Sequence, residues 1–262
     1  MTQKLNHRAV KAIYVLLAAV SLPANADWSG RLAVGVAQTN IREFNDGALI
    51  VKEIGWLPGI EAGVAYQTQA WQAFSRGSFY SGAIAHQGQI QNGQPFNSGT
   101  GTALLKWQLG ARRQIFGYWI GVAVEHDRWQ RNIVGRNQVI GLDEITSSDR
   151  VSIAGSRSWS TTVGDVNTEL GVYRAGPERL QVNFNGALDS VALKTRSATG
   201  YRAAAQFIPQ AYKSFEFGVT IDRIRIARSE SVSVTKNRSV QGVINQPEHL
   251  RRNVSFTVGY RF

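Results

Sequence analysis

The chain has 262 residues, no cysteine and a formal net charge of +11. The lack of cysteine excludes disulfides, thiol catalysis and cysteine metal sites. After the first 26 positions no run of about 18 apolar residues occurs, which excludes a helical membrane protein. The positive charge favours anionic partners, but no basic-aromatic motif accompanies it, so we expect no nucleic acid.

The N-terminus has the three parts of a secretory signal peptide in order. A basic segment without acids, 4–11, precedes an apolar run over 12–22 that is too short to span a bilayer. Pro23 ends the run, and Ala24 and Ala26 supply the small residues of a cleavage site. The sequence therefore predicts a signal peptide over 1–26, cleaved after Ala26, and one exported domain over 27–262.

Tight turns are predicted at four short segments rich in Gly or Pro: 57–59, 115–117, 175–178 and 209–214. In outer-membrane barrels short turns lie in the periplasm and longer loops lie outside. Four such turns join five hairpins. We therefore predict an all-β fold, a transmembrane antiparallel up-and-down barrel of about ten strands, with both termini in the periplasm.

The predicted strands fall between these turns. They cover about 28–38, 48–57, a segment starting at 60, 101–115, 118–133, 158–174, 179–188, 200–208, 215–228 and 253–262. The predicted outside loops are 39–47, 75–100, 134–157, 189–199 and 229–250. Because 78–91 is itself strand-like, a barrel of about twelve strands is the alternative.

The final segment, 253–262, alternates apolar and polar residues, and its length suits a tilted strand that crosses a membrane. The chain stops on Phe262, with Tyr260 two positions before it. In this respect it resembles outer-membrane barrels, whose last strand typically ends in Phe. The resemblance implies that Tyr260 and Phe262 carry the signal read by the barrel assembly machinery.

Acids and bases are both well represented on the inward face of the predicted strands. The set is Glu61, Lys106, Arg112, Glu125, Asp127, Asp165, Glu169, Arg202, Glu216 and Arg261. Charges in a narrow lumen must be paired, so we interpret this set as a compensated polar plug. The alternative is a narrow, selective conduit.

Several arginines lie near the predicted outer ends of two strands: Arg128, Arg131, Arg223, Arg225 and Arg228. Guanidinium groups can engage phosphate oxygens with two donors at once. Part of this set is predicted to bind lipopolysaccharide phosphates, and ordinary solvated loop charge is the alternative.

Glu125, His126 and Asp127 form the densest group of acid-base residues. On a strand His126 points away from both acids, so an interfacial band is the preferred interpretation. The mature histidines, His86, His126 and His249, are scattered. We expect no cofactor and no metal site.

The size and strand count resemble omptins, the outer-membrane aspartyl-type proteases. That family uses an Asp pair facing an Asp-x-His pair across the outside mouth. Here 75–100 contains His86 but no Asp, and Asp189 has no following His. The proteolytic residues therefore do not carry over. The stretches 80–89 and 125–129 resemble uncharacterised proteobacterial barrel proteins.

Three functions are compatible with the sequence. The first is a structural or surface-interaction barrel, expected to be a monomer among outer-membrane lipid and lipopolysaccharide. The second is a barrel enzyme that acts on lipid or peptide at the outside mouth, although no serine partner can be assigned to any histidine. The third is a small pore.

Overall fold

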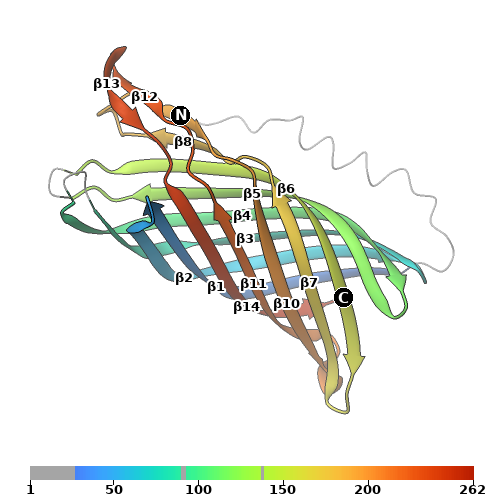
Figure 1. Ribbon diagram of the computed structural model, residues 1–262. Coiled ribbons are helices and arrows are strands. Elements are labelled where there is room, and N and C mark those ends of the chain that lie inside the picture. The colour runs from blue at the N-terminus through green and yellow to red at the C-terminus, as the bar shows by residue number, and fades with distance from the viewer. Residues whose placement is uncertain (1–26, 90–92, 137–138) are drawn as a thin grey trace.

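The computed structural model describes residues 27–89, 93–136 and 139–262. The predicted signal peptide, 1–26, lies outside the described residues. Within them, twelve strands form one antiparallel sheet, and ten of these close into a barrel through the β5–β6 pairing (Figure 1). The described part of the chain contains no helix long and apolar enough to span a membrane.

The barrel strands follow one another around the wall in chain order. They are β1 (Asp27–Asn45), β2 (Ala48–Gln67), β3 (Trp71–Gln89), β4 (Pro95–Ile115), β5 (Tyr118–Ile133), β6 (Leu142–Ser160), β7 (Gly164–Ala175), β10 (Ala198–Pro209), β11 (Phe215–Ile226) and β14 (Glu248–Arg261). Strand β1 pairs with β2 on one side and with β14 on the other. The two ends of the barrel domain therefore meet at one seam, and the predicted ten strands are confirmed.

The two ends of the barrel differ in their connections. The terminal end carries Asp27, Phe262 and the short connections 68–70, 116–117, 161–163 and 210–214, the last with the 3-10 turn η1 (Gln210–Tyr212). The opposite end, called the loop end below, carries the other connections. The strands β8 (Arg179–Asn183), β9 (Val191–Lys194), β12 (Val232–Lys236) and β13 (Ser239–Ile244) lie there.

These four short strands build an extension beyond the barrel (Figure 1). Strand β8 continues the sheet from the loop end of β6, β9 pairs with β8, and β12 and β13 form a separate hairpin. The extension has its own apolar core, made by Leu180, Val182, Phe184, Leu193 and Val234. It is therefore a folded structure rather than a set of loose loops.

Two of the four predicted turns are confirmed, those at 115–117 and 209–214. The prediction at 57–59 is wrong, because Pro58 lies inside β2. The β2–β3 pairing skips 55–58, where Pro58 has no amide hydrogen to donate. The segment 175–178 does connect two strands, but it lies at the loop end.

The two turns that the sequence analysis missed contain neither Gly nor Pro. In each, a threonine hydroxyl adds a hydrogen bond across the turn: Thr68 Oγ1 accepts from the Trp71 amide at 3.1 Å, and Thr161 Oγ1 accepts from the Gly164 amide at 3.2 Å. Hydroxyl turns of this kind are a weaker sequence signal than Gly or Pro.

The strand count was right because errors cancelled. The predicted strands divide β2 into two and include 179–188, which is β8 and the turn after it, among the membrane strands. Most of β3 and β6, in contrast, falls within the predicted outside loops 75–100 and 134–157. The twelve-strand alternative is wrong, because 78–91 belongs to β3 wherever it is described.

Apolar side chains cover the outside of the barrel wall. Large apolar side chains on the paired strands are exposed, among them Trp28, Val34, Val122, Leu170 and Phe217. This pattern is the reverse of a soluble sandwich and matches a wall that faces lipid. The predicted outward facing of Val34, Val122 and Leu170 is confirmed.

Candidate functional site

The inside of the barrel is filled at the loop end by one arginine among three glutamates. Arg131 Nη1 lies 2.9 Å from Glu43 and 3.0 Å from Glu144, and its Nη2 lies 2.9 Å from Glu53. All four side chains are buried. We call Arg131, Glu43, Glu53 and Glu144 the loop-end cluster.

Further polar groups surround Glu53. His86 Nδ1 lies 2.7 Å from Glu53 Oε1, and the Thr100 hydroxyl donates to the same oxygen at 2.9 Å. His86 and Thr100 are buried as well. The histidine of the predicted second loop is therefore an internal partner of a carboxylate and does not line an open mouth.

The assignment of Arg131 to a lipid-facing rim is wrong, because its side chain is 4% exposed and points inward. The error came from reading 39–47 and 134–157 as loops, although β1 and β6 continue through much of them. Beyond the apolar band the outward residues of these strands are polar too, as with Arg42 and Asp149. The alternation of apolar and polar residues is therefore absent where these inward charges lie. For this reason the predicted lumen set did not include Glu43 and Glu144.

Trp129 lies directly beside the loop-end cluster. The guanidinium carbons of Arg131 and Arg251 lie 4.8 Å and 5.4 Å from its ring. The indole nitrogen donates to Thr102 Oγ1 at 2.8 Å, and Trp129 is buried. A large, buried and hydrogen-bonded ring therefore packs against the arginines at this level.

A second group of charges occupies the middle of the lumen. The middle cluster consists of Lys106, Glu125, Asp127, Arg150, Arg202 and Asp222. Arg202 Nη2 lies 2.8 Å from both Glu125 Oε2 and Asp222 Oδ2, and Arg150 pairs with Glu125 at 3.1 Å and with Asp127. Lys106 lies 3.2 Å from Asp222, so each cation in this group has at least one carboxylate.

Glu178 joins this group to the loop end. It pairs with Arg251, which also lies 3.4 Å from Asp127, and its Oε2 lies 3.0 Å from His249 Nε2. Burial alone would raise the pKa of Glu178, but the Arg251 guanidinium and His249 hold this pKa at about 2. Glu178 therefore stays ionised at any physiological pH.

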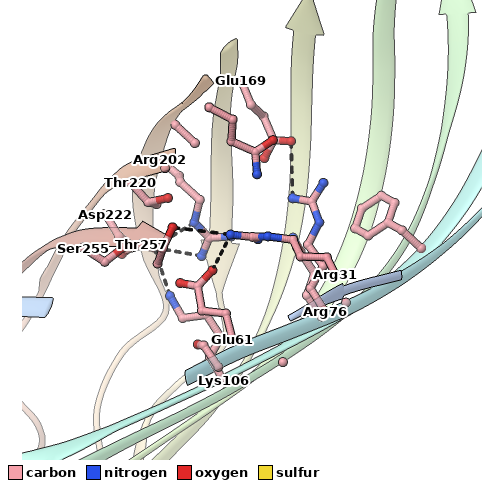
Figure 2. A pocket seen from close by; sticks show the side chains of 18 of the residues that line it. Arg31, Glu61, Arg76, Lys106, Glu169, Arg202, Thr220, Asp222, Ser255 and Thr257 are labelled. Atoms are coloured by element: carbon pink, nitrogen blue, oxygen red, sulfur yellow. Dashed lines mark hydrogen bonds and ion pairs between the residues drawn. The ribbon is translucent and has the colours of Figure 1, made fainter. Parts of the chain in front are cut away.

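The lumen is hollow from the terminal end to the level of Trp129. A cavity of about 480 Å³ extends from Ser29 and Gln67, past the middle cluster, as far as Ile41 and Trp129. Figure 2 shows Arg31 reaching toward Glu61, from which it lies 3.1 Å, and Arg76 reaching toward Glu169 at 3.5 Å. Arg31 also pairs with Glu216. The terminal end thus combines charged walls with free space.

Most of the predicted lumen set is inside the barrel. Ion pairs hold Glu61, Lys106, Glu125, Asp127, Glu169, Arg202 and Glu216. Arg112 donates to Ser156 Oγ at 3.1 Å, and Arg261 lies at the edge, 3.8 Å from Glu216. Asp165 is exposed at the start of β7, and none of the ion pairs found in the described residues includes it, so its assignment to the network is wrong.

The outside of the wall carries exposed cations above the apolar band. Arg128, Arg223 and Arg225 face outward as predicted, whereas Arg228 turns to Asp46 at 3.0 Å. The pairing register shows two features that sequence reasoning missed. Arg42 lies directly opposite Lys52, and Arg223 lies directly opposite Arg252.

His126 also lies on this outer face, while Glu125 and Asp127 are buried inside, as strand geometry predicted. Its Nδ1 lies 2.8 Å from the exposed Asp149, which is its direct neighbour on β6. At the loop end Asp189 is exposed and accepts a hydrogen bond from Thr235 Oγ1 at 2.6 Å. His86 and Asp189 therefore do not form a shared site.

Comparisons with known proteins support the fold. No family model and no curated protein matches the sequence. The solved structure of the outer-membrane protease OmpT from Escherichia coli matches with a TM-score of 0.58 and 10% identity, over 94% of this chain and 99% of that one. The translocator domain of the autotransporter NalP from Neisseria meningitidis gives 0.47 and 11%, over 98% and 94%. The chain has the fold of bacterial outer-membrane β-barrels.

Proposed function

We propose that this chain is an integral protein of the bacterial outer membrane that acts at the cell surface and does not conduct solutes. In this proposal the terminal end faces the periplasm and the loop end faces the exterior. The buried loop-end cluster and Trp129 support a closed lumen, and the folded extension supports a role at the surface.

The observation that carries the proposal is two pairs of opposed cations on the outer face of the wall. Like charges directly opposite each other on neighbouring strands destabilise a sheet. Neither Arg42 with Lys52 nor Arg223 with Arg252 has an ion pair to an acid among the described residues. These four lie on β2, β1, β14 and β11, which are adjacent in the wall, and together they form the cationic rim.

The cationic rim fits the phosphate groups of lipopolysaccharide. It lies just beyond the apolar band on the side assigned to the outer leaflet, where those phosphates are concentrated. Arginine forks engage phosphate oxygens with two donors, and an anion between two cations removes their repulsion. Arg225 contributes less to this surface, because it already pairs with Glu248.

We also propose that Tyr260 and Phe262 are read by the barrel assembly machinery. The Phe262 amide donates to the Gly30 carbonyl at 3.1 Å, and the Gly30 amide donates to the Phe262 carbonyl at 2.7 Å. These bonds close the seam between β1 and β14. Phe262 is thus both exposed at its ring and part of the pairing that closes the seam.

Thermal unfolding in two micelle types tests the lipopolysaccharide proposal. The double variant Arg223→Gln/Arg252→Gln should lose most of the stabilisation that lipopolysaccharide gives the wild type, and should melt normally in plain detergent. Arg157→Gln is the matched control, since Arg157 faces outward near the terminal end, away from the outer leaflet. Equal stabilisation of the double variant and the wild type by lipopolysaccharide would refute the proposal.

A further inference from the structure

One cation of the lumen has no carboxylate partner. Arg112 on β4 points into the cavity, donates to Ser156 Oγ at 3.1 Å and lies 5.3 Å from the Trp119 ring. Among the described residues, the other lysines and arginines that line this cavity form ion pairs, except Arg157, whose guanidinium lies over the Tyr118 ring on the outer face. The guanidinium of Arg112 is therefore the exception in a lumen that otherwise compensates its charges.

The position of Arg112 is supported by its neighbours. Its Nε is buried and has no hydrogen-bond partner among the described residues. Gly121 lies directly opposite on β5, and a Cβ there would come within 2.6 Å of the Arg112 Cβ. The glycine therefore leaves the room in which the arginine fits. Arg112 is half-buried, and a cation removed from water on one side without a carboxylate partner is unfavourable, so an anion beside it would stabilise the fold.

A second guanidinium faces the same cavity nearby. Arg76 has Glu169 as its ion-pair partner, at 3.5 Å, and 38% of its side chain is exposed. Gln108 lies opposite Arg76 and Gln72 lies opposite Arg112 in the β3–β4 register. Arg76 thus has one carboxylate, Arg112 has none, and the residues opposite these two arginines in the register carry uncharged amides.

We propose that Arg112, Arg76 and Ser156 form a binding site for an oxyanion of the phosphate class carried by a small solute. The two guanidinium groups supply charged donors and the serine supplies a hydroxyl donor. The cavity of about 480 Å³ has room for such a solute. Because its lining extends from Ser29 and Gln67 at the terminal end and stops at Trp129, the solute would enter from the periplasm.

The site is distinct from the cationic rim. Arg112 lies inside the barrel toward the terminal end, whereas the rim lies outside and toward the loop end. Loss of one site therefore leaves the other unchanged, and a failure of the lipopolysaccharide proposal does not affect this one.

Binding of inorganic phosphate to the detergent-solubilised protein, free of lipopolysaccharide, tests the proposal. Titration calorimetry at constant ionic strength, with chloride as the replaced anion, should show saturable phosphate binding to the wild type. Arg112→Gln should weaken it at least tenfold. Arg113→Gln should leave it unchanged, because Arg113 is the next residue on β4 but lies outside, over Trp71.

Two further variants keep the test decisive. Arg112→Lys retains the charge without the fork and should bind more weakly than the wild type but better than Arg112→Gln. If Arg112→Gln does not fold, Ser156→Ala takes its place and should weaken binding severalfold. Equal affinity in the wild type and the lumen variants, or no saturable binding to the wild type, would overturn the proposal.

Discussion

The two halves of the lumen differ in how many carboxylates surround an inward-facing arginine. At the loop end one guanidinium, that of Arg131, is surrounded by three buried carboxylates and packs against Trp129. At the terminal end Arg112 has no carboxylate and faces open space. A buried guanidinium held by three carboxylates holds strands together, whereas a guanidinium without a carboxylate beside a cavity is suited to receive a ligand. We therefore assign architecture to the first half and binding to the second.

The largest expected effect comes from removing the central cation of the loop-end cluster. Arg131→Met should lower the free energy of unfolding by roughly 3–5 kcal/mol, because it leaves three buried carboxylates without their partner. Chemical unfolding in micelles free of lipopolysaccharide measures this. Arg128→Met is the control, since Arg128 lies on the same strand but faces outward, and it should change the free energy by less than about 0.5 kcal/mol. A similar loss of unfolding free energy in both variants would show that the loop-end cluster does not stabilise the fold more than an outward arginine does.

Acidification tests the same half of the lumen through Glu178. Its folded-state pKa of about 2 lies below the ordinary value of 4.5, so its contribution to stability is present above about pH 4.5 and is lost as the pH falls toward 2. The loss should be on the order of 3 kcal/mol. The Glu178→Gln variant should show a flatter stability profile over this range. Parallel profiles of variant and wild type would contradict the role of Arg251 and His249.

The smallest effect is expected at the terminal end. Without phosphate, Arg112→Met should change the free energy of unfolding by no more than about 1 kcal/mol, because no carboxylate loses a partner. The same unfolding measurement detects it. A loss as large as that of Arg131→Met would show that Arg112 is structural and that the two halves are alike.

The architecture could be predicted from sequence wherever the wall faces lipid. Period-two alternation over 118–133 and 253–262 identified β5 and β14, because lipid outside and polar lumen inside impose opposite chemistry on alternate residues. The turns were harder to predict from the sequence. Thr68 and Thr161 close their turns through hydroxyl groups, and Pro58 lies inside a strand where it suggested a turn.

The site was only half predictable for a related reason. Glu125, Asp127 and Arg202 lie on strands whose outer face is apolar, so their inward facing could be read directly. Glu43, Glu144 and Arg131 lie where the strands rise above the lipid and both faces are polar. Which residues meet across the lumen depends on the closure of the barrel, and the partners Arg131 and Glu43 are 88 positions apart in sequence.

Ion conductance is the most direct test of a lumen that is closed at the loop end and open only toward the terminal end. Purified protein, refolded without lipopolysaccharide, is inserted into a planar lipid bilayer and recorded in symmetric salt. A lumen blocked by Trp129 and the loop-end cluster predicts a flat baseline with no stable single-channel steps. Reproducible steps of constant amplitude from the wild-type protein would contradict it.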